Sequence, residues 1–301
     1  MNLLITGAWN EAKQNISLLE QIGHRVCFMQ QEKDALPCDY NWVEGVICNG
    51  LFLHHPIEKF QNLKYIQLTS AGYDRVDLEY IQKHGIEIHN ARGVYSIPMA
   101  EVALSGVLQL YKQAAYFYEN KKMCKWEKHR GLKELFGKKV LIAGCGSVGN
   151  ECAKRFAAFG CEVTGIDLYP REDMLYKKIL PLTELDAQLK GADIVVLTLP
   201  LTDQTKHILN RERIKTLKKD AVLVNIARGA VIDTAALLEQ IDHLGGAVLD
   251  VFEEEPLSES NPLWKKQNII LTPHNSFVGD GNGERLKNII LANLEKRGNK
   301  K

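Results

Sequence analysis

Residues 140–167 read VLIAGCGSVGNECAKRFAAFGCEVTGID, and this stretch predicts the fold of the chain around it. An apolar strand leads into a G-x-G-x-x-G turn formed by Gly144, Gly146 and Gly149, and a helical run then reaches a second strand that ends on Asp167. In such a turn the first glycine allows the tight bend, the second lets the backbone approach a pyrophosphate, and the third lets helix and strand pack closely. The combination predicts a dinucleotide-binding βαβ unit.

The acid at the end of the second strand selects between the two nicotinamide dinucleotides. Asp167 lies 18 residues past Gly149, near the spacing of about 20 expected for an acid that hydrogen-bonds a ribose 2′-hydroxyl. A carboxylate there would repel a 2′-phosphate, so NAD is favoured over NADP. Arg171 stands nearby and leaves acceptance of NADP open. The helix after the turn would offer unpaired N–H groups and a partial positive charge to the phosphates.

Composition excludes several classes of protein. The chain has 301 residues, enough for two domains, and a net charge of +1 gives no electrostatic reason to expect nucleic acid or a membrane as partner. Seven cysteines without a C-x-x-C pair predict free thiols in a reducing compartment and no metal site. The apolar run at residues 3–5 is too short for a signal peptide, and no segment has the roughly 18 apolar residues of a membrane helix. We therefore expect a soluble, cytoplasmic protein.

Short apolar runs alternate with helical patterns, which is typical of parallel sheets covered by helices. Most runs are continuously apolar, as a sheet buried on both faces requires. The sequence therefore predicts an α/β protein with two doubly wound parallel-sheet domains, the second with six strands. The predicted strands are residues 3–6, 26–29, 46–48, 65–68 and 86–88 in the first domain, and 140–143, 163–166, 194–197, 221–224, 247–249 and 269–271 in the second.

Two predicted helices flank the strands of the second domain in the sequence. Residues 99–118 predict one long helix that is apolar on nearly all sides in its first half, and Pro98 suits its first turn. Such a helix is expected to be buried between domains or in a subunit interface. Residues 120–133 predict a polar connector with Trp126 as its single large apolar anchor, and residues 283–296 predict a final amphipathic helix.

Polar groups follow the last three predicted strands, at the carboxyl ends where doubly wound sheets bind their ligands. They are Arg228, the glutamates 253–255 and His274. An arginine could grip a carboxylate with two hydrogen bonds and polarise an adjacent carbonyl. A histidine could exchange a proton with a substrate oxygen, and a nearby glutamate would stabilise its imidazolium form. Each group alone could be a structural ion pair or a solvated turn, but their joint placement favours a catalytic set.

Several motifs occur in a characteristic order along the chain. They are Thr69–Asp74 (TSAGYD), Trp126 ahead of Glu134–Lys138 (ELFGK), the glycine turn with Asp167, Val224–Gly229 (VNIARG), Leu249–Phe252 (LDVF) leading to Glu255–Pro256, and Thr272–His274 (TPH). Together they resemble the D-isomer-specific 2-hydroxyacid dehydrogenase family over nearly the whole length. The resemblance implies hydride transfer between NAD and the C2 atom of a small D-2-hydroxy acid or 2-keto acid. It also implies a flavodoxin-like substrate-binding domain of residues 1–97 and 276–301, and a Rossmann NAD-binding domain of residues 98–275.

The resemblance assigns roles to individual residues. His274 is the acid/base and is paired with Glu255, Arg228 anchors the substrate carboxylate and carbonyl, and the N–H groups of Ala71 and Gly72 complete the carboxylate pocket from the first domain. The implied cofactor contacts are Gly144, Gly146, Gly149 and Asp167, Ser147 and Val148 at the pyrophosphate, Leu199, Pro200, Thr205, Ile226 and Ala227 along the site, and Asp250 against the nicotinamide carboxamide.

The resemblance also implies a homodimer, with the subunit interface on the helix that begins at Met99. Two alternatives stay open. One is formate-type dehydrogenation, which the pairing of His274 with Glu255 rather than with an uncharged amide disfavours. The other is a redox-sensing regulator of the same fold that binds NAD(H) without metabolic turnover.

The identity of the acid and the physiological direction stay open. Tyr73 and the stretch 275–279 depart from the family's usual residues near the expected substrate cleft. The loop at residues 49–52 is expected to shape the side-chain pocket, where Leu51 and Phe52 favour a small or apolar group. No extra cation stands out there for a phosphate.

Overall fold

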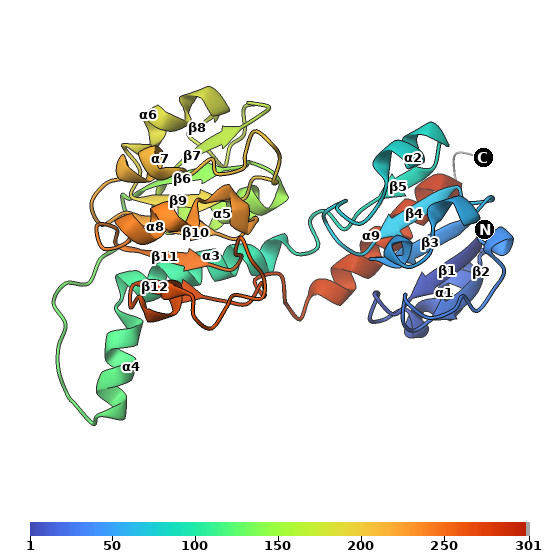
Figure 1. Ribbon diagram of the computed structural model, residues 1–301, viewed down its shortest axis with the longest axis horizontal. Helices are drawn as coiled ribbons and strands as arrows, with labels where there is room; N and C mark the ends of the chain where they lie inside the picture. Colours follow the sequence, from blue (N-terminus) through green and yellow to red (C-terminus); the bar gives the residue numbers. More distant parts are fainter. Residues whose placement is uncertain (299–301) are drawn as a thin grey trace. The chain divides into compact units, whose positions relative to one another are not determined.

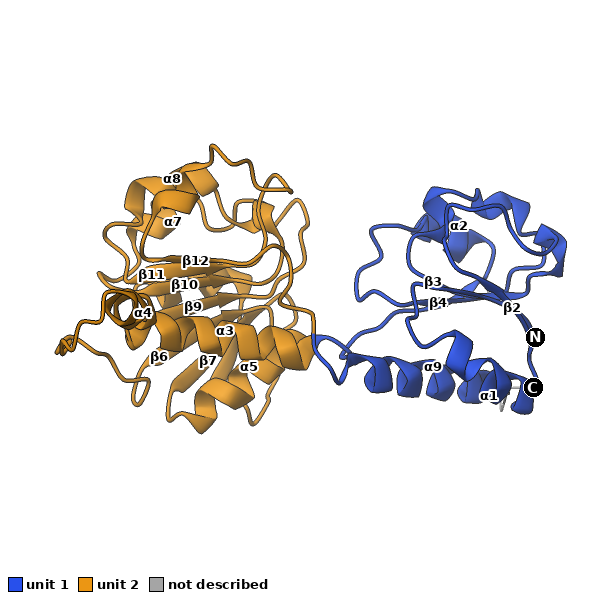
Figure 2. Cartoon of the chain, turned by 90° about the horizontal axis from the view of Figure 1, so that it is seen from below, with its two compact units in different colours: residues 1–95, 279–301 blue, residues 96–278 orange. Residues whose placement is uncertain are grey.

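The computed structural model describes residues 1–298, which divide into two compact units (Figure 2). Unit 1 comprises Met1–Tyr95 and the chain from Gly279 onward, and unit 2 comprises Ser96–Val278. The chain therefore leaves unit 1 once and returns to it for the last helix. No helix within residues 1–298 is both long and apolar enough to cross a membrane.

Unit 1 is built on a parallel sheet of five strands among the described residues. The order β2-β1-β3-β4-β5 reverses direction between β1 and β3, which is the flavodoxin-like form of a doubly wound sheet. This confirms the predicted fold class for the first domain. The strands are β1 (Asn2–Thr6), β2 (Arg25–Met29), β3 (Gly45–Cys48), β4 (Tyr65–Leu68) and β5 (Glu87–His89).

Helices cover both faces of this sheet. The C-terminal helix α9 buries Leu286, Ile290 and Leu294, spaced four residues apart on one face, in a cluster that also contains Leu3 and Trp9. Near the N-terminus the chain forms a 3₁₀ turn followed directly by a short α-helix. The helical elements of unit 1 are η1 (Lys13–Asn15), α1 (Ile16–Gln21), η2 (Tyr40–Trp42), η3 (Leu51–Leu53), η4 (Ile57–Lys59), α2 (Leu78–Lys83) and α9 (Asn282–Gly298).

Unit 2 contains a parallel sheet that reads β12-β11-β10-β9-β6-β7-β8 across residues 1–298. The order reverses between β6 and β9, as in a Rossmann domain. The sequence predicted six strands, and β8 was missed because this edge strand carries Lys178 and Pro181 beside only two apolar residues. The strands are β6 (Lys139–Ala143), β7 (Glu162–Asp167), β8 (Lys178–Pro181), β9 (Ile194–Leu197), β10 (Val222–Asn225), β11 (Gly246–Leu249) and β12 (Ile269–Leu271).

The predicted single helix 99–118 is wrong, because the chain forms two helices there. Gln113 has a φ of 54°, a left-handed conformation that an α-helix cannot contain, and it separates α3 from α4. Figure 1 shows α4 projecting from the sheet-and-helix body of unit 2. The helical elements are α3 (Ser96–Tyr111), α4 (Ala114–Lys122), α5 (Ser147–Ala158), η5 (Leu182–Glu184), α6 (Leu185–Leu189), α7 (Arg211–Lys215), η6 (Gly229–Val231), α8 (Thr234–Gln240) and η7 (Pro262–Lys265).

Helix α3 packs closely on the sheet of its own unit. Ala100, Ala103 and Val107 lie fully buried in the cluster that lines one face of the sheet. A Cβ atom added at Gly106 would lie 2.6 Å from the methyl groups of Val248 in β11, so the glycine permits the close approach. The buried face predicted for this helix therefore packs, at least in part, against the sheet of unit 2.

Candidate active site

The glycine turn after β6 has the geometry that a pyrophosphate needs. Gly144 has a φ of +100°, and a Cβ atom there would lie 2.7 Å from the backbone nitrogen of Leu199. A Cβ at Gly149 would lie 2.0 Å from the carbonyl oxygen of Gly144, so helix and turn can be this close only without a side chain. A Cβ at Gly146 would meet no atom within 4 Å, which leaves open space beside its backbone.

The N-terminus of α5 presents unpaired donors next to that open space. Gly146 is the N-cap residue and supplies no side-chain acceptor. Within the described residues no acceptor lies in hydrogen-bond contact with the N–H groups of Ser147, Val148 and Gly149; the first such bond runs from Asn150 to the Gly146 carbonyl oxygen at 2.9 Å. Three unpaired N–H groups and the positive end of the helix dipole fit an anionic phosphate.

Asp167 fixes the turn from the end of the neighbouring strand. Its Oδ2 atom accepts a hydrogen bond from the Cys145 N–H at 2.6 Å, and its Oδ1 atom accepts one from the Tyr169 N–H at 3.0 Å. Arg171 donates to the carbonyl oxygen of Cys145 and lies 3.7 Å from an oxygen of Asp173. A carboxylate can accept about four hydrogen bonds, so Asp167 keeps capacity for a ribose hydroxyl. The turn and the acid therefore fit NAD.

The other residues assigned to the cofactor differ in exposure. Leu199 and Ile226 are buried, at 3% and 1% exposure, whereas Pro200 is exposed. Thr205 is completely buried and holds the loop together, because its hydroxyl donates to the Pro200 carbonyl oxygen at 2.6 Å and accepts from the Thr202 N–H at 2.8 Å. Of these residues, Pro200 presents its side chain to solvent, whereas the buried Thr205 fixes the conformation of the loop through its hydrogen bonds.

Asn225 organises the turn that carries Arg228. Its side chain is 1% exposed, donates to the carbonyl oxygen of Arg228 at 3.0 Å and accepts from the Ala227 N–H at 3.1 Å. The Arg228 guanidinium donates to the Ala227 carbonyl oxygen at 2.8 Å. A Cβ at Gly229 would lie 1.8 Å from the carbonyl carbon of Phe252, so the glycine lets the turns after β10 and β11 meet. The role of Asn225 was not predicted from the sequence.

The loops that follow β11 and β12 bring His274 and Glu255 together. The distance from His274 Nδ1 to Glu255 Oε2 is 2.8 Å, and Glu255 Oε1 accepts a hydrogen bond from the Phe252 N–H at 2.9 Å. Both side chains are part-exposed, at 43% for the histidine and 36% for the glutamate. With Nδ1 engaged, Nε2 is the nitrogen that can meet a substrate, and none of the described residues hydrogen-bonds to it.

Asp250 holds the loop that carries His274. Its carboxylate is completely buried and accepts from the Thr272 hydroxyl at 2.6 Å, the Asn275 N–H at 2.7 Å, and both the N–H and the hydroxyl of Ser276. Its carbonyl oxygen accepts from the His274 N–H at 2.7 Å, and His274 has a left-handed φ of 50°. Asp250 therefore positions the histidine backbone; its contact with the nicotinamide carboxamide stays a prediction.

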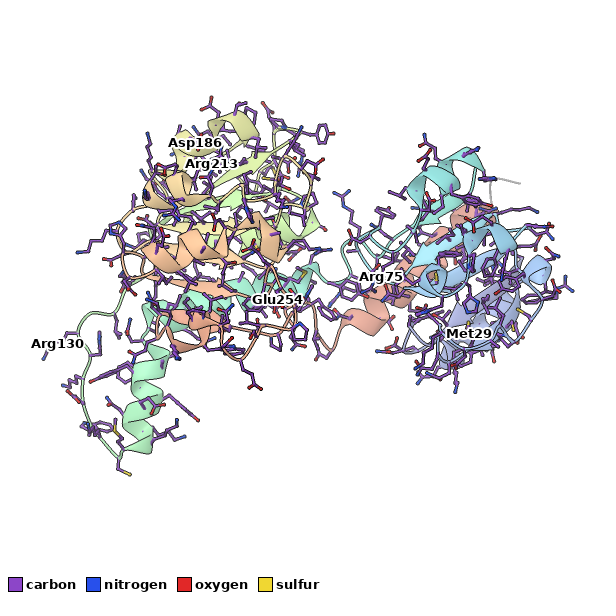
Figure 3. The ribbon with its side chains drawn as sticks, viewed as in Figure 1. Met29, Arg75, Arg130, Asp186, Arg213 and Glu254 are labelled. Atoms are coloured by element: carbon purple, nitrogen blue, oxygen red, sulfur yellow. The ribbon has the colours of Figure 1, made fainter. Side chains whose placement is uncertain are left out.

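A second histidine–glutamate pair lies in the same unit. His207 Nε2 lies 2.6 Å from Glu253 Oε1, and Glu253 Oε2 accepts from the Thr234 N–H at the start of α8. Partial burial of Glu253 opposes its ionisation, but the hydrogen bonds from Thr234 and His207 lower its pKa. The three glutamates thus have different roles: Glu253 anchors α8, Glu255 pairs with His274, and Glu254, labelled in Figure 3, takes part in neither pair. This second pair was not predicted.

Two thiols of the glycine turn and of α5, Cys145 and Cys152, do not offer a nucleophile. Cys145 in the glycine turn is completely buried, and burial raises the pKa of its thiol to about 12. Burial likewise raises the pKa of Cys152 to about 12. Thiolate is the reactive form, so both groups are unreactive at neutral pH. Among residues 1–298, no three His, Cys, Asp or Glu side chains gather as metal ligands.

In unit 1 the loop after β4 has hydrogen-bonded carbonyl oxygens and N–H groups without an acceptor among the described residues. Asn90 donates to the Ala71 carbonyl oxygen at 2.6 Å, and the Ser70 hydroxyl donates to the Gly72 carbonyl oxygen at 3.1 Å. The N–H groups of Ala71 and Gly72 meet no acceptor within the described part of the chain. The carbonyl side of this loop is therefore occupied, and its N–H side remains available to an anion.

The loop after β3 differs from the expectation for the side-chain pocket. Leu51 is completely buried in the core of unit 1, and Phe52 packs edge-on against Phe60 with 5.8 Å between ring centroids. Leu53 is 63% exposed and is the apolar side chain that this loop presents to its surroundings. The prediction that Leu51 shapes the pocket is wrong because hydrophobic burial draws it into the core.

The chain is similar to several enzymes of one family. It is 33% identical over 243 residues to the glyoxylate reductase of Thermofilum pendens, which covers 77% of this chain and 71% of that protein. It is 37% identical over 223 residues to the D-3-phosphoglycerate dehydrogenase of Methanocaldococcus jannaschii, which covers 72% of this chain but only 42% of that protein. The crystal structure of D-lactate dehydrogenase from Aquifex aeolicus, complexed with NAD and lactic acid, superposes with a TM-score of 0.77 at 27% identity and covers 98% of this chain and 94% of that one.

The family profile places the NAD-binding part of the chain. The profile described as "D-isomer specific 2-hydroxyacid dehydrogenase, NAD binding domain" matches residues 104–276, which include the glycine turn, Arg228 and His274. This range lies within unit 2. The fold of both units, the dinucleotide turn and the match over more than half of the sequence agree, and the chain therefore belongs to the D-isomer-specific 2-hydroxyacid dehydrogenase family and carries its NAD-binding domain.

Proposed function

We propose that this protein is an NAD-dependent dehydrogenase that interconverts a small D-2-hydroxy acid and its 2-keto acid. The observation that carries the proposal is the His274–Glu255 pair, with 2.8 Å between Nδ1 and Oε2. The pair lies on the loops that follow β11 and β12, at the edge of the NAD-binding sheet where doubly wound folds bind their ligands.

The residues around the glycine turn would hold the cofactor. The N–H groups of Ser147 and Val148 would donate to the pyrophosphate, and the backbone at Gly146 would allow its close approach. Asp167 would accept from the ribose, while Pro200 and Ala227 would lie along the cofactor. When bound, NAD supplies or accepts the hydride.

His274 would handle the proton of the substrate oxygen. During reduction the imidazolium donates a proton from Nε2 to the oxygen that becomes the hydroxyl, and during oxidation the neutral ring takes that proton back. Glu255 on Nδ1 orients the ring and stabilises its charged form. Arg228, on the turn after β10, would grip the substrate carboxylate and polarise the neighbouring carbonyl.

The substrate-binding role falls to unit 1, and we place its domain at residues 1–97 and 276–301 with the NAD-binding domain at 98–275. The support is the loop after β4. Its carbonyl oxygens on Ala71 and Gly72 are hydrogen-bonded internally, while its N–H groups are available to a carboxylate. This assignment rests on the family resemblance together with that loop geometry.

The subunit interface and location are part of the same proposal. Large apolar side chains are exposed on α4 and the segment after it, including Tyr118 at 59%, Met123 at 53% and Trp126 at 99%. Exposed apolar clusters of this kind mark interaction surfaces, so we propose a homodimer that buries this segment. The seven cysteines are all free, which supports a reducing, cytoplasmic location.

A panel of 2-keto acids tests the proposed reaction. We expect NADH oxidation with at least one of glyoxylate, pyruvate, hydroxypyruvate and 3-phosphohydroxypyruvate, and weaker turnover with NADPH because of the Asp167 carboxylate. NADH binding without turnover of any keto acid would instead favour a redox-sensing regulator. NADH formation from formate in the absence of keto-acid reduction would favour a formate-type dehydrogenase.

A further inference from the structure

Glu32, which follows β2 in unit 1, has an unusual set of hydrogen-bond partners. Its Oε1 atom accepts from the Thr6 hydroxyl at 2.7 Å and from the Asn49 N–H at 2.7 Å, and its Oε2 atom accepts from the Gly50 N–H at 2.6 Å. Thr6 ends β1, and Asn49 directly follows β3. One carboxylate thus joins the ends of two neighbouring strands.

This position is the switch point of the unit 1 sheet. The strand order reverses between β1 and β3, and doubly wound sheets bind ligands in the crevice beyond the strand ends at such a point. Two successive backbone N–H groups aimed at one anion form an anion-binding concavity. In this protein the half-buried carboxylate of Glu32 occupies that concavity, so the chain supplies its own anion.

The loop held by Glu32 neighbours the loop proposed to bind the substrate carboxylate. Strands β3 and β4 are adjacent and parallel, and the Thr69 N–H donates to the Cys48 carbonyl oxygen at 2.8 Å where the two strands end. Their following loops, with Asn49–Gly50 on one and Ala71–Gly72 on the other, therefore lie at the same edge of the sheet.

Two exposed side chains flank the backbone that Glu32 holds. A Cβ atom at Gly50 would lie 3.4 Å from Leu53 Cδ1, 3.5 Å from Glu32 Oε2 and 3.8 Å from Arg75 Cδ. Leu53 is 63% exposed, and Arg75, labelled in Figure 3, is exposed as well. The side chains of Leu53 and Arg75 thus both lie next to the backbone that Glu32 holds.

We propose that Glu32 is a positioning residue for substrate selection. Its carboxylate fixes the loop after β3 so that Leu53 and Arg75 present one defined surface to the group on C3 of a 2-keto acid. Glu32 itself does not touch the substrate. The inference rests on the proposed function, because it takes unit 1 as the substrate-binding domain.

The substitution Glu32→Gln separates the carboxylate from the size of the side chain. A glutamine amide has one acceptor oxygen and an NH₂ group that cannot accept from an N–H, so at least one hydrogen bond to the loop is lost. Glu58→Gln is the matched control, since Glu58 is an exposed glutamate of the same unit without a hydrogen bond or ion pair among residues 1–298. Thr6→Val is a second test that removes one donor to Glu32 and keeps the shape of a buried side chain.

The kinetic test compares keto acids with and without a C3 group. For Glu32→Gln we expect the KM of pyruvate or hydroxypyruvate to rise about tenfold, equivalent to about 1.4 kcal/mol, while the KM of glyoxylate changes much less. The kcat and the affinity for NADH should stay near their original values. Thr6→Val should shift the same KM values in the same direction by a smaller factor, Glu32→Asp should restore part of the loss, and Glu58→Gln should change nothing. Equal effects on glyoxylate and the three-carbon acids, or no effect on either, would overturn the proposal.

Amide hydrogen exchange separates this inference from the proposed function. The Asn49 and Gly50 amides are hydrogen-bonded to Glu32, so they should exchange faster in Glu32→Gln than in the original protein or in Glu58→Gln. If no keto acid is turned over, the proposed function fails while this measurement still reports on the loop. Unchanged exchange at both amides would refute the positioning role of Glu32 whatever the enzyme catalyses.

Discussion

Among single residues, two histidine–glutamate pairs of unit 2 have nearly the same contact but different surroundings. The pairs are His274–Glu255 at 2.8 Å and His207–Glu253 at 2.6 Å. The second carboxylate oxygen of Glu253 accepts a hydrogen bond from the N-terminus of α8, so that pair helps to hold this helix in place. His274 instead stands at the end of β12 on a loop held by the buried Asp250. The position of His274 just beyond the carboxyl end of β12, rather than its pairing with a glutamate, marks it as the candidate acid/base.

The two histidines provide a matched experiment. His274→Ala removes the proposed acid/base, so turnover should fall by at least about 10²-fold while NADH binding persists. His207→Ala removes the same contact type outside the proposed site and should leave turnover within about threefold. Steady-state kinetics and NADH titration of both variants check this. Comparable turnover losses in the two variants would argue against the assigned role of His274.

At the scale of elements, Asp193 joins three strands of the NAD-binding sheet. It directly precedes β9, accepts from the N–H of Lys139 in β6 at 2.8 Å, and accepts from the ammonium group of Lys218, ahead of β10, at 2.9 Å. Partial burial opposes ionisation of Asp193, but these hydrogen bonds outweigh it and hold its pKa below the ordinary value. The ionised carboxylate therefore stabilises the start of the central strands.

The lowered pKa predicts a pH-dependent contribution. Because the folded pKa lies below the unfolded value of about 3.9, the stabilisation is present above that value and is lost as the pH falls through the folded pKa. Asp193→Asn should lower the free energy of unfolding by about 1–3 kcal/mol at pH 7. The difference from the original protein should shrink when urea unfolding is repeated at an acidic pH below both values. Asp203→Asn, at an exposed site, is the control; an Asp193→Asn effect that does not change with pH would contradict this account.

For the whole molecule, the exposed apolar side chains of residues 114–133, which comprise α4 and the connector after it, would be unusual in a protein that works as a single chain. This segment projects from the body of unit 2 and carries Trp126 with its side chain 99% exposed (Figure 1). Burial of a tryptophan removes a large apolar area from water, and Trp is enriched among the hot-spot residues of interfaces. The proposed homodimer, in which a second copy of the chain covers this segment, would account for its composition.

Trp126→Ala tests that assembly. We expect the original protein to sediment as a dimer and the variant to dissociate at least about tenfold more readily, the scale of an interface hot spot. Trp264→Ala is the control, because Trp264 is 54% exposed on η7, a different element of unit 2. Analytical ultracentrifugation over a range of concentrations measures both. A monomeric original protein, or equal weakening by both substitutions, would refute the proposed interface.

Much of this architecture was predictable because its signals are local in the sequence. The glycine turn, Asp167 and the apolar runs each depend on neighbouring residues, so they predicted both doubly wound sheets, the NAD-binding unit and the strand ends that carry Arg228 and His274. The misses had weak local signals. Strand β8 is a polar edge strand, and the break at Gln113 depends on a single left-handed residue within a helical pattern.

The fold class and the cofactor follow from hydrophobic periodicity and turn chemistry, and the reaction class follows from the resemblance of the ordered motifs to the family. The folded structure was needed to show how residues distant in the chain divide their roles. It separated Glu253 from Glu255, buried Leu51 while it exposed Leu53, and brought Glu32 to the ends of β1 and β3. Hydrogen bonds between strand ends depend on which strands are neighbours in the sheet, and that information is absent from any local stretch of sequence.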